Sequence, residues 1–130
     1  MITIKLYTSY FANNKKIPKE IKRISIAKFS PRWIKCDSYS PAAPPIDLLY
    51  NFKNKEICEK EYIEIYNKHL NSLDGNLVIT HLKQLSGGKD IVFLCYENSD
   101  KFCHRHLFLD WLKQFCNESI EACGEFGAAS

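Results

Sequence analysis

The feature that most constrains the fold is a short segment in which every residue is apolar. Ile91–Cys95 has the sequence Ile-Val-Phe-Leu-Cys and directly follows Asp90. A strand with one face in water alternates apolar and polar residues, whereas a strand inside a parallel sheet is apolar on both faces. The segment is much shorter than the ~18 apolar residues of a membrane-spanning helix. It therefore predicts an interior strand of a parallel sheet.

Two further segments are predicted to be strands beside this one. Ile2–Tyr7 alternates apolar and polar residues, and Arg23–Ala27 is a short apolar segment that precedes Pro31. Apolar residues at helical spacing predict helices over about 46–52, 57–73, 76–85 and 103–115. Strands that alternate with helices indicate a single three-layer α/β/α domain with a mostly parallel sheet.

The length of the chain suits one such domain. It has 130 residues, of which 45% are hydrophobic and 25% charged, so it can bury one ordinary core and is not disordered throughout. We expect the domain to span residues 1–118. Residues 119–130 are expected to be a frayed or vector-derived tail, because Gly124–Ser130 is small and featureless.

Neither a membrane segment nor a metal site is expected. No apolar stretch is long enough to span a membrane, and the first residues do not resemble a signal peptide, so the expected location is the cytoplasm. The chain has six cysteines but no Cys-x-x-Cys pair, which argues against structural zinc. We expect mostly reduced thiols and no cofactor.

Ligands of parallel α/β sheets bind outside the carboxyl ends of the strands. The segments that follow Leu6, Ile26 and Leu94 are therefore the candidate positions for a site. Ser38–Pro45, which contains three prolines, is predicted to be a loop of the length at which loops tend to be functional.

The segment after Leu94 carries the most distinctive pattern. A polar loop with Glu97 leads to Cys103-His104-Arg105, which opens a helix. A helix N-terminus favours anions and thiolates, and a guanidinium offers a planar fork to phosphate or carboxylate. The same residues also allow a structural interpretation, in which Cys103 is packed, His104 bonds within the loop and Arg105 pairs with Glu97.

These residues resemble a known family. Leu94–Glu97 followed by Cys103–Arg105 is similar to the signature of the domain-of-unknown-function family numbered 488. Tyr7–Tyr10, and Ile24–Ala27 followed by Pro31 and Trp33, also fit its short bacterial and phage members. The resemblance covers about residues 6–115. It implies an α/β/α fold and a pocket at the Cys-His-Arg helix but no particular reaction, and it suggests a role in nucleotide metabolism or phage–host conflict.

Three functions remain open. The first is binding of a small anionic ligand, a nucleotide or a nucleotide-derived signal, and the second is an enzyme that hydrolyses or transfers a nucleotide or nucleoside. The third is nucleic-acid binding through the basic stretch Lys15–Arg32, whose alternative interpretation is a solvated surface.

Formation of a homo-oligomer is left open, and no membrane partner is expected. The candidate ligand-binding residues are Thr8, Ser9, Tyr10, Trp33, Cys95 and Arg105, and the candidate catalytic residues are Glu97 as base or nucleophile, His104 as general acid, and Cys103.

Overall fold

The centre of the molecule is one five-stranded sheet in which all neighbouring strands are parallel. The computed structural model describes residues 3–96 and 104–126. The strand order is β3-β2-β4-β1-β5. The strands are β1 (Ile4–Tyr10), β2 (Lys22–Ser25), β3 (Asp37–Ser38), β4 (Ile91–Cys95) and β5 (Ile120–Glu125). The expected strands thus exist, and β2, β4 and β1 are neighbours as predicted.

The helices follow the capping signals of the sequence. Asp74 caps one helix because its carboxylate accepts hydrogen bonds from the backbone N–H groups of Asn76 and Leu77, and Gly87 ends that helix at φ 59°. None of the described helices is long and apolar enough to cross a membrane. The helices are α1 (Ile46–Lys53), α2 (Glu59–Asn71), α3 (Gly75–Ser86) and α4 (His104–Leu112), with short 3-10 helices η1 (Phe11–Lys16), η2 (Ser40–Ala42) and η3 (Lys113–Phe115).

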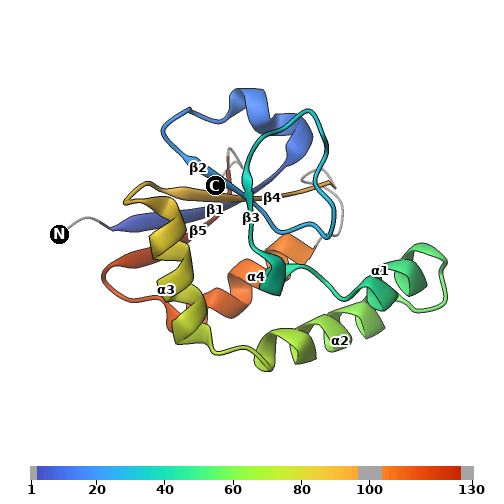
Figure 1. Cartoon of the computed structure of the whole chain (residues 1–130). Helices are drawn as coiled ribbons and strands as arrows, with labels where there is room; N and C mark the ends of the chain where they lie inside the picture. The colour runs from blue at the N-terminus through green and yellow to red at the C-terminus, as the bar shows by residue number, and fades with distance from the viewer. Residues whose placement is uncertain (1–2, 97–103, 127–130) are drawn as a thin grey trace.

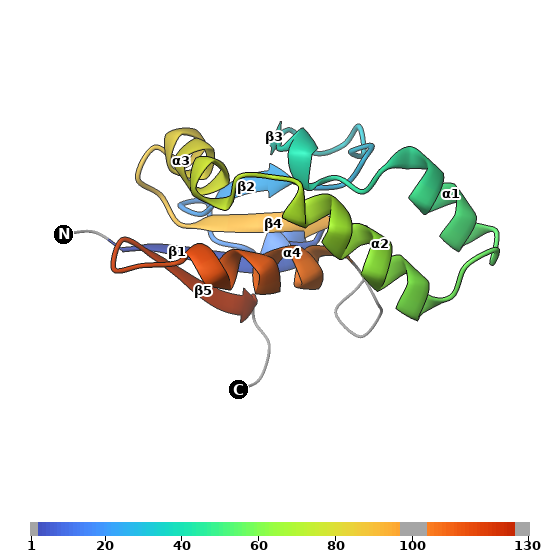
Figure 2. The same cartoon turned by 90° about the horizontal axis from the view of Figure 1, so that it is seen from below.

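The two faces of the sheet are covered differently. Ile91 and Phe93 belong to the larger core, which contains apolar residues of all four α-helices. Val92 and Leu94 point the other way and pack with Phe11 of η1 and with the chain between β2 and β3. Figures 1 and 2 show the α-helices on one side of the sheet and η1 on the other. The predicted single α/β domain is confirmed, and its second outer layer is η1 with loops.

Strand β5 was not predicted from the sequence. It lies inside the segment that we expected to be a tail, and it pairs with β1 at the edge of the sheet. Ile120 is completely buried, whereas Glu121 and Cys123 are exposed. One strongly apolar residue in six is a weak strand signal, so the pairing with β1 decides the conformation. The sheet therefore continues to Glu125.

Candidate functional site

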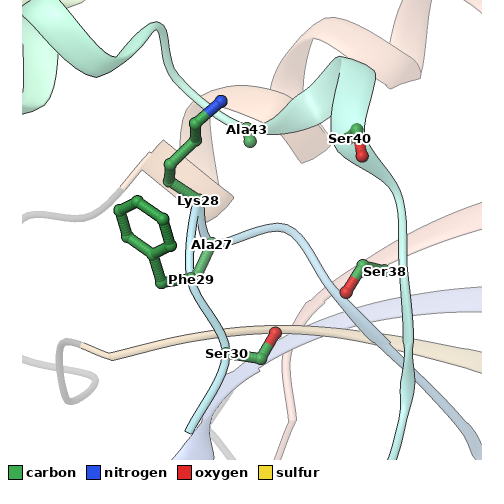
Figure 3. A pocket seen from close by; sticks show the side chains of 7 residues that line it. All are labelled: Ala27, Lys28, Phe29, Ser30, Ser38, Ser40 and Ala43. Carbon is green, nitrogen blue, oxygen red and sulfur yellow. The ribbon is translucent and has the colours of Figure 1, made fainter.

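A pocket opens at the carboxyl ends of β2 and β3 (Figure 3). Its volume is about 380 Å³, within the range of small-molecule sites. One wall comes from the chain that follows β2, and the other from the end of β3 and from η2. The lining residues are Ala27, Lys28, Phe29, Ser30, Ser38, Ser40 and Ala43.

The topology explains why the pocket lies there. The chain that leaves β2 turns toward the face of η1, where Ile34 packs with Val92 and Leu94. The chain that leaves β3 turns toward the opposite face, where Ala42 and Leu48 join the core of the α-helices. β2 and β3 are neighbours, but the segments that follow them cross to opposite faces of the sheet. This leaves a crevice between the two segments, which is the usual place where ligands bind to parallel α/β sheets.

The lining combines one cation, three hydroxyls and an aromatic ring. Lys28 and Phe29 are exposed on one wall, and Ser38 and Ser40 stand on the other (Figure 3). Ser30 lies below them and donates a hydrogen bond to Ser25 Oγ at 2.7 Å. Ammonium and hydroxyl groups are donors to anionic oxygens, and a ring offers a flat apolar face. The set suits a ligand that has both an anionic and a flat part.

Side chains of the helical layer hold the second wall in place. Tyr66 of α2 donates a hydrogen bond to the carbonyl of Ala42 at 2.6 Å. His69 Nε2 lies 2.9 Å from the carbonyl oxygen of Pro41, and the hydroxyl of Tyr39 lies 3.1 Å from His81 Nδ1. These contacts fix η2 and β3 against α2 and α3, so the pocket does not need to form on binding.

His104 holds the first wall. Its Nε2 donates a hydrogen bond of 2.6 Å to the carbonyl of Ile26, the residue before the pocket-lining Ala27. Burial, together with the nearby charge of Arg105, lowers the pKa of His104 to about 4, although the hydrogen bond to Ile26 acts in the opposite direction. The imidazole is therefore neutral at pH 7, and its Nε2 proton is used by the backbone. This geometry makes His104 a positioning residue of the pocket wall.

Arg105 is fully buried and holds a carboxylate of the chain itself. Its Nε and Nη2 donate to the two carboxylate oxygens of Glu125 at 3.1 and 2.9 Å, a bidentate contact. Thr8 donates to the same carboxylate at 2.7 Å, and Arg105 Nη1 lies 2.9 Å from Cys95 Sγ. The ring of Tyr10 lies 5.9 Å from the guanidinium. Arg105 thus has a structural ion pair with Glu125, and Glu97, the partner considered from the sequence, lies outside the described residues.

A family model decides the relationship of the chain. The model of DUF488-N3a, described as the active DUF488-N3 subclade, matches residues 6–115. The chain belongs to the DUF488-N3a family. Comparison with curated proteins and with solved structures gave no match. The matched segment of this DUF488-N3a protein contains the whole pocket and Arg105, and ends before Glu125.

The site residues predicted from the sequence fall into separate groups in this DUF488-N3a protein. Thr8, Tyr10, Cys95 and Arg105 meet at the carboxyl ends of β1 and β4. Trp33 lies in the loop between β2 and β3, outside this group, and is 64% exposed.

Ser9 is buried, and its Oγ accepts a hydrogen bond from Asn13 at 3.0 Å. Successive residues of a strand point to opposite faces, so Ser9 faces away from the Thr8–Arg105 group. Glu97 and Cys103 lie outside the described residues. The sequence analysis missed Lys28, Ser38 and Ser40 as individual residues, although it marked the segment after Ile26 and the loop 38–45 as candidate positions.

The cysteines differ in part from the expectation. Cys95 is disulfide-bonded, so the prediction of a reduced thiol is wrong for this residue. Cys36, Cys58, Cys116 and Cys123 are free thiols. Within residues 3–96 and 104–126, no group of three or more His, Cys, Asp or Glu side chains is placed to hold a metal ion.

Proposed function

We propose that this DUF488-N3a protein binds a small anionic ligand of the nucleotide class in the pocket between β2 and β3. The observation that carries the proposal is one pocket with Lys28 on one wall, Ser38 and Ser40 on the other, and Phe29 also in its lining. A cytoplasmic role in nucleotide metabolism or in conflict between bacteria and phages belongs to the same proposal.

Each lining group has a part in this binding. The Lys28 ammonium contacts the phosphate, because it is the cation of the pocket lining. The hydroxyls of Ser38 and Ser40 donate to phosphate oxygens or bond the ribose hydroxyls. Phe29, with 61% of its surface exposed, stacks on the base. Relative to the sequence analysis, the phosphate position moves from the Arg105 helix to the end of β2.

The buried residues His104 and Arg105 support this site from behind. His104 fixes the backbone just before Ala27 through Ile26. Arg105 joins α4 to β5 through Glu125 and so holds the helix that carries His104. Their role is to keep the pocket walls in place before the ligand arrives.

The description of the family as an active subclade favours a second candidate function. In it the protein hydrolyses or transfers the bound nucleotide, and Glu97 of the sequence analysis supplies the carboxylate. The Nε2 proton of His104 is bonded to a backbone carbonyl, so Glu97 carries the proton transfer in this candidate function.

Calorimetric titration with AMP, GMP, CMP, UMP and inorganic phosphate tests the first function. We expect at least one nucleotide to bind, and Lys28→Met to weaken it about ten- to a hundredfold, the loss of one charged hydrogen bond. Lys53→Met, which removes an exposed lysine of α1, is the matched control and should bind normally. Mass spectrometry of the titrated mixture shows whether the nucleotide is intact or converted. No binding by any of these ligands, or equal affinity in the two variants, would contradict the proposal.

A further inference from the structure

The loop that leaves the pocket carries an unusual surface. Between β2 and β3, the loop 28–35 exposes two large aromatic side chains, Phe29 at 61% and Trp33 at 64%. The cations Lys28, Arg32 and Lys35 alternate with them, and all three are exposed. We call these five side chains the aromatic-basic loop.

The backbone of this loop is anchored, so its aromatic side chains are held toward solvent. Ile34 is buried and packs on Val92 and Leu94 of β4. Its backbone N–H bonds the carbonyl of Pro31 at 3.4 Å, which closes a turn around Arg32 and Trp33. Exposed aromatic groups on an anchored turn are a recurrent property of binding surfaces.

The adjoining 3-10 helix extends the positive charge. The segment of η1 and the turn after it expose Lys15, Lys16 and Lys19 on the same side of the sheet (Figure 1). Two other cations of the basic stretch are used by the fold. Lys22 forms an ion pair with Asp37 at 2.8 Å.

Arg23 is the second of these structural cations. Its guanidinium donates hydrogen bonds to the η1 segment and the turn after it, including 2.7 Å to Asn14 Oδ1 and 2.6 Å to the carbonyl of Ile17. Arg23 therefore fixes the basic segment to β2. Six cations remain exposed on this side: Lys15, Lys16, Lys19, Lys28, Arg32 and Lys35.

We propose that this side of the sheet binds single-stranded nucleic acid, with one nucleotide of the strand in the pocket. The inference rests on the proposed function, because Phe29 belongs both to the pocket and to the aromatic-basic loop. Proteins that hold single strands combine cations along the backbone with aromatic rings on which bases stack. Phe29 and Trp33 are four residues apart, so their Cα atoms are at most about 14 Å apart and can serve bases of one strand.

The chemistry selects a single strand over a duplex. The flat faces of bases are covered by their neighbours in a duplex and are accessible in a single strand. Exposed rings with surrounding cations match a polymer of flat groups and phosphates. DNA and RNA share this chemistry, and the experiment separates them.

Fluorescence anisotropy of labelled twelve-nucleotide single strands of DNA and RNA tests the surface. Trp33→Ala should weaken binding about 5- to 150-fold, the range for one stacked base. Tyr50→Ala is the matched control, because Tyr50 is an exposed aromatic residue of α1 on the other side of the sheet, and it should bind normally. Trp33 emission should also be quenched by the strand, whereas Trp111, which is 6% exposed, should not respond.

The charges are tested by salt dependence. The slope of log affinity against log salt concentration should become shallower by about 1.4 in the double variant Arg32→Gln/Lys35→Gln, about 0.7 for each lost cation. Lys60→Gln/Lys68→Gln removes two exposed cations of α2 and should leave the slope unchanged. The duplex of the same sequence and polyglutamate serve as competitors and should displace the strand poorly.

The outcomes separate the two proposals. If mononucleotides bind and the strands bind no more tightly, the strand surface is wrong and the pocket proposal stands. If the strands bind with loss in Trp33→Ala but mononucleotides do not bind and Lys28→Met has no effect, the pocket proposal is wrong and only the surface remains. Equal affinity of Trp33→Ala and Tyr50→Ala, or efficient displacement by polyglutamate, would overturn the surface.

Discussion

Removal of the Glu125 carboxylate is predicted to destabilise the whole domain. Glu125→Ala leaves the Arg105 guanidinium, whose side chain is 0% exposed, without the carboxylate that it contacts through two nitrogens. Breaking a buried ion pair from one side costs about 3–5 kcal/mol. The Glu125 side chain is 11% exposed, so water can enter from its side, and we take the lower end of that range.

The loss of the Thr8 hydrogen bond adds to this cost. Thr8 is buried and donates to the same carboxylate at 2.7 Å, and an ordinary hydrogen bond contributes about 1 kcal/mol. The expected total is about 3–4 kcal/mol, a large share of the roughly 5–15 kcal/mol that stabilises a domain. The corresponding decrease in Tm is about 11–15 °C.

Urea unfolding followed by circular dichroism at pH 7 measures this effect. The midpoint should decrease while the m-value stays the same, which indicates lost stability without a change in exposed surface. Glu121→Ala is the control, because Glu121 is an exposed residue of the same strand, and it should change the free energy of unfolding by less than about 0.5 kcal/mol. If the two variants unfold at the same urea concentration, Glu125 does not balance the charge of Arg105 and our account of this network is wrong.

Three further substitutions test the supports of the pocket. Burial lowers the pKa of His104 from 6.5 to about 4. Between pH 6.5 and 4 the unfolded chain therefore binds more protons than the folded one, and the free energy of unfolding decreases as the pH falls through this range. His104→Gln keeps a donor for Ile26 and should lose this part of the pH dependence, up to about 3 kcal/mol, as measured by urea unfolding at pH 7 and 4.5. Arg23→Lys should speed amide hydrogen exchange in η1, because a lysine cannot reach the several carbonyls that the guanidinium bonds; unchanged exchange would show that η1 is held without it. Tyr66→Phe should lower the free energy of unfolding by about 1–2 kcal/mol, because the buried carbonyl of Ala42 loses its donor, and a neutral result in thermal unfolding would contradict that role.

The sheet could be predicted where local sequence decides the structure. Ile91–Cys95 is apolar on both faces, and only an interior strand buries both. Asp74 and Gly87 mark the two ends of α3 through capping, which is a local interaction. Strand β5 has no comparable local signal, because its conformation depends on pairing with β1 at the other end of the chain.

The candidate site shows the same division. The topology rule placed a site after Ile26, and the pocket lies there. The role of Arg105 could not be predicted, because its partner Glu125 is twenty residues away and comes from the unpredicted strand. The sequence offered Glu97 as a structural partner of Arg105, whereas the described part of the fold pairs Arg105 with Glu125.

The central position of β1 has a consequence for how the chain folds during synthesis. β1 leaves the ribosome before the other strands of this sheet, yet both of its sheet neighbours, β4 and β5, are made long after it. Until they are made, β1 has two open edges that can pair with other nascent chains. Translation at about 5–20 residues per second keeps them open for several seconds. The domain must therefore complete its sheet after most of the chain has been synthesised, and we expect its yield in cells to depend on chaperones that cover β1 during that interval.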